Sequence, residues 1–133
     1  MRTTARETVY KYLFSRLFNG NDEGLFTALK IGARLNEKDG AFADELLSAV
    51  LKDVDFFNEK ISEFSHSFAF DRIFATDKCA IYIGMAELKS FPDTPKAVAI
   101  NEAVNIAAKY STDKSTDFVN GILARFAEEI DDG

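Results

Sequence analysis

The chain contains one histidine and one cysteine, and these are its only imidazole and its only thiol. A catalytic Ser–His or Cys–His pair would have to use His66, which stands between two serines in a polar break. That position favours a solvated loop histidine over a catalytic one. Cys79 falls on the apolar side of a predicted helix, which favours a buried, inert thiol over a reactive one. The residues alone therefore make an enzyme the weaker hypothesis.

Acidic side chains are numerous, but their spacing predicts no metal or phosphate site. A calcium loop needs alternating oxygen ligands around a glycine and a closing glutamate, and residues 19–23 resemble one only superficially. No glycine-rich phosphate loop is present, and a single cysteine makes a poor metal site. We therefore expect neither a metal nor a cofactor.

Two short polar stretches near the C-terminus remain as candidate interaction sites. Asn101 and Glu102 stand near the start of a predicted helix, where the helix dipole favours a carboxylate. Asn120 precedes Gly121 inside a clear helical pattern, although glycine there costs about 1 kcal/mol relative to alanine. We expect Gly121 to admit a neighbouring helix at close range, so that Gly121→Leu would overpack the fold. Asn120 would either brace that contact through a backbone group, Asn101 or Glu102, or bind a ligand directly.

The composition is that of one small folded domain, since 47% of the 133 residues are hydrophobic and 29% are charged. Two prolines and seven glycines leave few helix breakers. No apolar run is long enough to cross a bilayer, the first residues lack the apolar core of a signal peptide, and a lone cysteine suits a reducing compartment. We therefore expect a soluble, cytoplasmic protein with no membrane contact.

The net charge of −6 argues against strong nucleic-acid binding by the whole surface, because phosphate affinity comes largely from Lys and Arg. Any contact with RNA must be local, or shared with a basic partner.

Apolar residues recur at helical spacing along almost the whole chain, which predicts an all-α fold. The stretch 80–85 has the composition of a buried strand, but a lone strand would have nothing to pair with. Thr3 or Thr4, Asp22, and Thr76 or Asp77 are the predicted caps of three helices. The predicted helices cover residues 4–18, 22–35, 41–64, 76–88, 95–110 and 115–130.

A set of short motifs stands out along this helical pattern. Those motifs are residues 5–7 (ARE), 13–15 (LFS), 87–88 (EL), 95–104 (PKAVAINEAV) and 118–123 (FVNGIL). Together they resemble the family of bacterial transcription antitermination factors called NusB, most strongly over residues 76–124. The resemblance implies about six to seven helices in one domain of two packed bundles, roughly residues 1–66 and 67–133.

The resemblance also implies a function and a set of sites. NusB-like proteins pair with the small-subunit ribosomal protein NusE, and the pair grips boxA RNA in ribosomal RNA transcripts within the transcription elongation complex. Carried over by position, the RNA surface comprises Arg2, Arg6, Lys114, Phe118 and Asn120, and the partner surface comprises Asp77 and Glu87. We expect the RNA residues to form one small cationic and aromatic patch at one end of the fold.

Arg2 and Arg6 lie about one turn apart and could serve one RNA segment, so Arg6→Ala would weaken RNA binding without unfolding the domain. Phe118 suits base stacking, although its spacing fits a core phenylalanine equally well.

Two rival functions stay open at this stage. The first is a protein–protein adaptor of the same fold with little RNA binding, which the sparse basic N-terminus favours, since only Arg2 precedes Arg6. The second is a fragment of an RNA cytosine methyltransferase, because NusB-like domains also occur fused to such enzymes. The absence of a cofactor loop argues against the second. NusB-like proteins occur as monomers and as homodimers, and the sequence does not decide between the two states.

Overall fold

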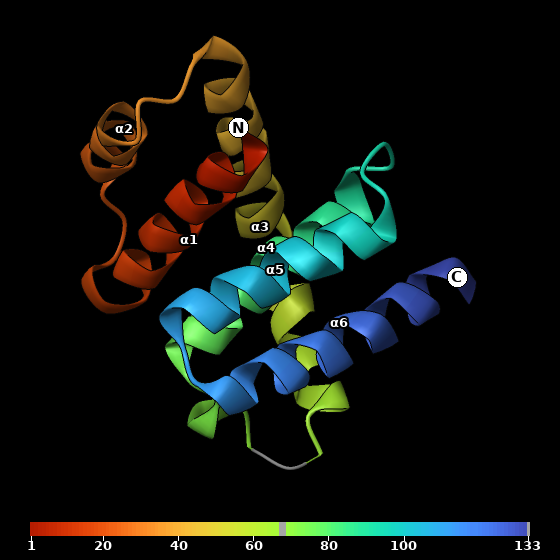
Figure 1. The fold of residues 1–133 in the computed structure, drawn as a ribbon. Helices are drawn as coiled ribbons and strands as arrows, with labels where there is room; N and C mark the ends of the chain where they lie inside the picture. Colours follow the sequence, from red (N-terminus) through yellow and green to blue (C-terminus); the bar gives the residue numbers. More distant parts are fainter. Residues whose placement is uncertain (67–68, 133) are drawn as a thin grey trace.

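The computed structural model describes residues 1–66 and 69–132, and the regular structure in these residues is entirely helical (Figure 1). This confirms the all-α prediction, including the helix over residues 80–85. Residues 67 and 68, where the two predicted bundles would join, lie outside the described residues. The elements are α1 (Arg2–Asn19), α2 (Glu23–Gly32), α3 (Glu37–Phe64), the short 3₁₀ helix η1 (Phe70–Arg72), α4 (Ala75–Ser90), α5 (Lys96–Tyr110) and α6 (Asp113–Asp132).

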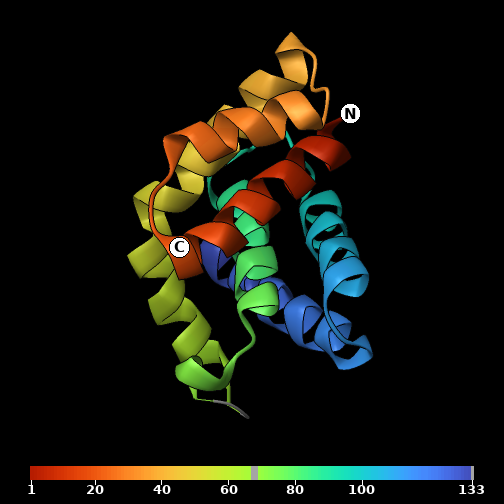
Figure 2. The same ribbon diagram turned by 90° about the vertical axis from the view of Figure 1, so that its left-hand side faces the viewer.

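Helix α4 lies at the centre of the molecule and packs against α1, α3, α5 and α6. Figure 2 shows it between α3 on one side and α5 on the other. Every residue from 79 to 87 is buried, so α4 is covered on all its faces. A helix that is apolar all round belongs in a core, which explains why this segment lacks a polar stripe. None of the described helices is both long enough and apolar enough to cross a membrane.

The helix starts test the predicted caps. Asp22 caps α2 as predicted, because its carboxylate accepts a hydrogen bond from the Leu25 amide at 3.1 Å. The predicted threonine cap of the first helix is wrong, since α1 already begins at Arg2. The predicted cap of α4 is also wrong, because this helix begins at Ala75 and residues 76 and 77 lie within its first turn.

The close approach between helices occurs at Gly84 and not at Gly121, which corrects the sequence-based expectation. A Cβ atom added at Gly84 would lie 2.5 Å from Cδ1 of Leu123 and 3.2 Å from Cβ of Ala103. Gly84 therefore lets α4 approach both α5 and α6. Nothing lies within 4 Å of a Cβ atom added at Gly121, and nothing in the structure explains the glycine there.

The two glycines offer a matched test of this packing. Gly84→Ala is expected to lower the free energy of unfolding by about 1–3 kcal/mol, because its methyl group would displace the Leu123 side chain in a filled core. Gly121→Ala is expected to raise it by up to about 1 kcal/mol, because alanine is the better helix former and the space is open. Urea denaturation of both variants measures the difference. Equal shifts would contradict the close approach at Gly84.

Candidate functional site

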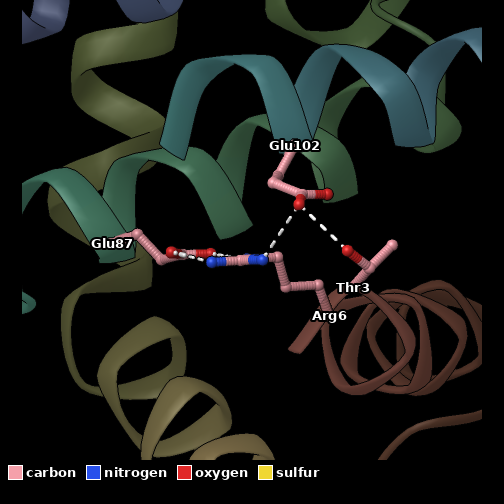
Figure 3. A network of polar contacts seen from close by, with 4 residues as sticks. All are labelled: Thr3, Arg6, Glu87 and Glu102. Atoms are coloured by element: carbon pink, nitrogen blue, oxygen red, sulfur yellow. Dashed lines mark hydrogen bonds and ion pairs between the residues drawn. The ribbon is translucent and has the colours of Figure 1, made fainter. Parts of the chain in front are cut away.

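An ion network inside the protein joins α1, α4 and α5, and its members are drawn in Figure 3. The Arg6 guanidinium donates from Nε to one Glu87 oxygen at 2.5 Å and from Nη2 to the other at 2.9 Å. Its Nη1 lies 3.3 Å from a Glu102 carboxylate oxygen, which also accepts a hydrogen bond from the Thr3 hydroxyl at 2.9 Å. Arg6 thus makes a bidentate pair with Glu87 and bridges to Glu102, the geometry in which guanidinium–carboxylate pairs are strongest.

This network corrects the roles expected for Arg6 and Glu87. Arg6 is 3% exposed and Glu87 is 0% exposed, so in this structure neither side chain reaches RNA or a partner directly. An unpaired carboxylate in the core would be costly, and Arg6 supplies the opposite charge. The two residues that the family resemblance assigned to separate surfaces therefore bind each other.

The first turns of α1 are held against α5 by further polar contacts. Glu7 accepts hydrogen bonds from Nζ of Lys109 at 2.7 Å and from the Tyr110 hydroxyl at 3.2 Å. One turn later, the rings of Tyr10 and Tyr110 stack with centroids 5.1 Å apart. These contacts fix the direction in which α1 leaves the core, and with it the position of Arg2.

Arg2 is exposed, as a residue that binds RNA must be. Its guanidinium carbon lies 4.4 Å from the centre of the Phe42 ring, within the range of a cation–π contact. Arg2 also lines a hollow with residues 90–94, which follow directly from the C-terminal end of α4. The structure therefore places Arg2 beside the end of the central helix.

Two of the other predicted RNA residues, Lys114 and Phe118, lie beside the opposite end of α4. Lys114 is exposed in the first turn of α6, Phe118 is half-buried one turn later, and Asn120 is exposed. Lys114 and Phe118 line a pocket of about 220 Å³, and Asp77 from the first turn of α4 also lines it. The structure shows no hydrogen bond from Asn120 to Asn101 or Glu102, all three of which it describes, so the expected bracing is absent.

Asp77 is buried and not presented to a partner, which corrects its expected role. Its two carboxylate oxygens accept hydrogen bonds from the hydroxyls of Ser111 at 2.8 Å and Ser115 at 3.1 Å. Ser111 and Ser115 flank the turn between α5 and α6. Asp77 therefore holds the turn between α5 and α6 against the start of α4, and with it the first turn of α6, where Lys114 lies.

The predicted RNA residues do not form the single patch that we expected. Arg2 adjoins Ser90, whereas Lys114 and Phe118 adjoin Asp77, and Asp77 and Ser90 are thirteen positions apart along the helix. At 1.5 Å per residue, Asp77 and Ser90 lie about 20 Å apart along the axis of α4, so the two groups flank opposite ends of this helix.

The groups that suggested catalysis are placed as the sequence predicted. Cys79 is fully buried, and this burial raises the pKa of its thiol to about 12. His66 is exposed beyond the end of α3, and its Nε2 atom accepts a hydrogen bond from the Arg125 guanidinium at 2.9 Å. In the described part of the chain, no three His, Cys, Asp or Glu side chains are grouped to hold a metal ion.

The sequence reasoning missed two residues beside the Lys114 pocket. Arg72 and Phe74 also line it, and Phe74 is 58% exposed at the start of α4. An exposed aromatic residue two positions after an arginine, just before a helix, was the available signal. It was overlooked because Phe74 also fits the apolar pattern of the chain.

Comparisons with known proteins agree with this arrangement. The model of the NusB family matches residues 1–128. The transcription antitermination protein NusB of Natranaerobius thermophilus is 32% identical over 133 residues, covering 97% of this chain and 96% of that protein. NusB of Desulforudis audaxviator is 35% identical over 129 residues, covering 96% and 94%.

Solved structures share the fold. NusB of T. maritima superposes with a TM-score of 0.89 at 28% identity, covering 97% of this chain and 92% of that one. A chain in a crystal structure of the antitermination factors NusB and NusE in complex with dsRNA gives a TM-score of 0.86 at 22% identity, covering 96% of each chain.

The order of the helices around α4 defines an all-helical protein of the antitermination-factor class. With the family model matched over nearly its whole length and several relatives above 30% identity, the chain belongs to the NusB family.

The ion network predicts that Arg6 is needed for folding. Arg6→Ala would leave Glu87 buried without its counter-charge and is expected to lower the free energy of unfolding by about 3–5 kcal/mol. Lys109→Ala is the matched control, because it removes only the exposed Lys109–Glu7 ion pair, and exposed ion pairs contribute little to stability. Thermal and urea denaturation compare the two variants. A cost for Arg6→Ala no greater than for the control would refute the structural role.

The raised pKa of Cys79 predicts that the native thiol is unreactive. At pH 8 we expect a chromogenic disulfide reagent to leave the folded protein unmodified and to label one thiol after denaturation, because the thiolate is the attacking species. Absorbance of the released thiolate measures both reactions. Labelling of the native protein as fast as a free cysteine would contradict the burial of Cys79.

Proposed function

We propose that this chain is an RNA-binding transcription antitermination factor that pairs with NusE on boxA-type RNA of ribosomal RNA transcripts. The single observation that carries the proposal is its membership of the NusB family over residues 1–128. The NusB–NusE–RNA structure with the same fold gives a precedent for both ligands. The proposal places the chain in the transcription elongation complex, as an adaptor and not as an enzyme.

The charge of the chain supports a shared RNA surface. With a net charge of −6 and Arg6 used inside the core, Arg2 and Lys114 are the remaining predicted cations, one at each end of α4. Two widely spaced cations give weak, salt-sensitive phosphate binding. A basic partner on the same RNA would supply further charge, and an acidic chain attracts such a partner.

The partner surface is best placed on the C-terminal half of α1, since Asp77 and Glu87 are buried. There Phe14, Leu17 and Phe18 are 36%, 49% and 66% exposed, and the rings of Phe14 and Phe18 pack with centroids 5.0 Å apart. Contiguous exposed apolar groups on a small protein mark interaction sites. Burial of this surface by NusE would leave both ends of α4 open to RNA.

The second candidate function is a NusB-like protein–protein adaptor with little RNA binding of its own. The observation that favours it is the burial of Arg6, which leaves Arg2 as the only exposed Lys or Arg among residues 1–10. In that case the exposed surface of α1 would still bind a partner, or a second copy of the chain.

Filter binding with boxA-like RNA separates the two functions. We expect weak retention by the chain alone and stronger retention with NusE, in each case falling as salt rises. Arg2→Ala and Lys114→Ala should each weaken binding and reduce the salt slope by about one, because each removes one phosphate contact. Lys52→Ala, which removes an exposed charge from the middle of α3, is the matched control and should change neither quantity. Absence of RNA affinity even in the NusE complex would favour the adaptor function.

A further inference from the structure

The pocket that contains Lys114 has one apolar wall built from two parts of the chain. Ile73 and Phe74 come from the segment between η1 and α4, and Phe118 comes from the second turn of α6. Phe74 is 58% exposed, so one aromatic ring stands at the mouth of the pocket. Aromatic side chains beside a small cavity suit the flat face of an unstacked base.

Two cations line the same pocket. Arg72 and Lys114 are both exposed, and they come from two parts of the chain, one before α4 and the other in the first turn of α6. The exposed acids that flank them in sequence, Asp71 and Asp113, do not line the pocket. A ligand whose ring enters the cavity can therefore keep a phosphate at the rim, beside a guanidinium or an ammonium group.

Buried polar groups form the remaining side of the pocket. Asp77 is 5% exposed and Ser115 is 3% exposed, and both line the cavity. Each Asp77 oxygen accepts one serine hydroxyl, from Ser111 or Ser115, and so keeps capacity for one more hydrogen bond. A carboxylate accepts hydrogen bonds and cannot donate them, so the group that it binds must be a donor such as an amino group.

From these three walls we infer that the pocket binds one unstacked nucleotide and prefers adenine or cytosine to uracil. The exocyclic amino group of the base faces Asp77, the ring lies against Phe74 and Phe118, and the phosphate meets Arg72 or Lys114. Uracil presents a carbonyl oxygen where the other two bases present the amino group, and this oxygen would face the carboxylate. The inference rests on the proposed function only in taking RNA as the source of the nucleotide.

The test uses mononucleotides and the full chain. AMP, CMP, UMP and inorganic phosphate are titrated separately against ¹⁵N-labelled protein, and the amide shifts of residues 72–77 and 112–118 are followed. We expect AMP and CMP to shift these amides with dissociation constants about fivefold or more below that of UMP, the ratio that one good base contact provides. Equal binding of UMP, equal shifts with phosphate alone, or no shifts at these residues would overturn the inference.

Variants at the exposed walls keep the test independent of folding. Phe74→Ala and Arg72→Ala are expected to weaken AMP binding severalfold, whereas Lys52→Ala on α3 should leave it unchanged. Asp77→Asn should remove the preference over UMP, because an amide can also donate to a carbonyl oxygen. If Asp77→Asn does not fold, the Phe74→Ala and Arg72→Ala variants and the comparison with UMP still test whether the pocket binds a nucleotide.

The outcome is separable from that of the proposed function. If the complex with NusE binds RNA but mononucleotides do not shift the amides of residues 72–77, only the inference on the pocket is contradicted. If mononucleotides bind at these residues but the complex with NusE does not bind RNA, only the proposed function is contradicted.

Discussion

The pairing of Arg6 with Glu87 is the interaction on which the rest of the structure depends. Helix α4 is enclosed by four other helices, and Glu87 is the charged residue in its fully buried stretch, residues 79–87. A single guanidinium from α1 satisfies that carboxylate and also contacts Glu102 of α5. A buried carboxylate must be neutralised by an opposite charge, so the network requires α1, α4 and α5 to meet in one register. Apolar packing alone constrains such a register less strictly.

That register decides where the exposed groups lie. The ties from Glu7 to α5 aim the N-terminus of α1 at the C-terminal end of α4, where Arg2 lies over Phe42. The hydrogen bonds from Ser111 and Ser115 to Asp77 hold the α5–α6 turn at the opposite end. The central helix thus holds these two small surfaces at a fixed separation.

The sequence predicted the helices well because helical periodicity is a local property. Asp22 was identified as a cap from its own neighbourhood, and the structure agrees. The errors concern contacts between distant residues. Arg6 and Glu87 are 81 positions apart, and charged residues are usually exposed, so nothing local indicated their burial. Gly84 was overlooked because α4 is apolar on every face, and Gly121 was favoured because it interrupts an otherwise clear pattern. The family resemblance gives the RNA residues only as positions in the sequence. Their separation into two groups in space became visible only in the folded structure.

The burial of Arg6 also changes what the acidic composition means for RNA binding. A guanidinium that neutralises Glu87 contributes nothing to phosphate affinity, so the chain meets RNA with fewer cations than its N-terminal motif suggests. Affinity must then come from groups that do not depend on net charge, such as aromatic stacking, or from a basic partner. Of the predicted RNA residues, only Phe118 offers an aromatic surface, and the ring beside it in the same pocket belongs to Phe74. The affinity of such a surface for RNA would depend more on the type of base than on the number of phosphates that it contacts. This suits a factor that must select one short element within a long transcript.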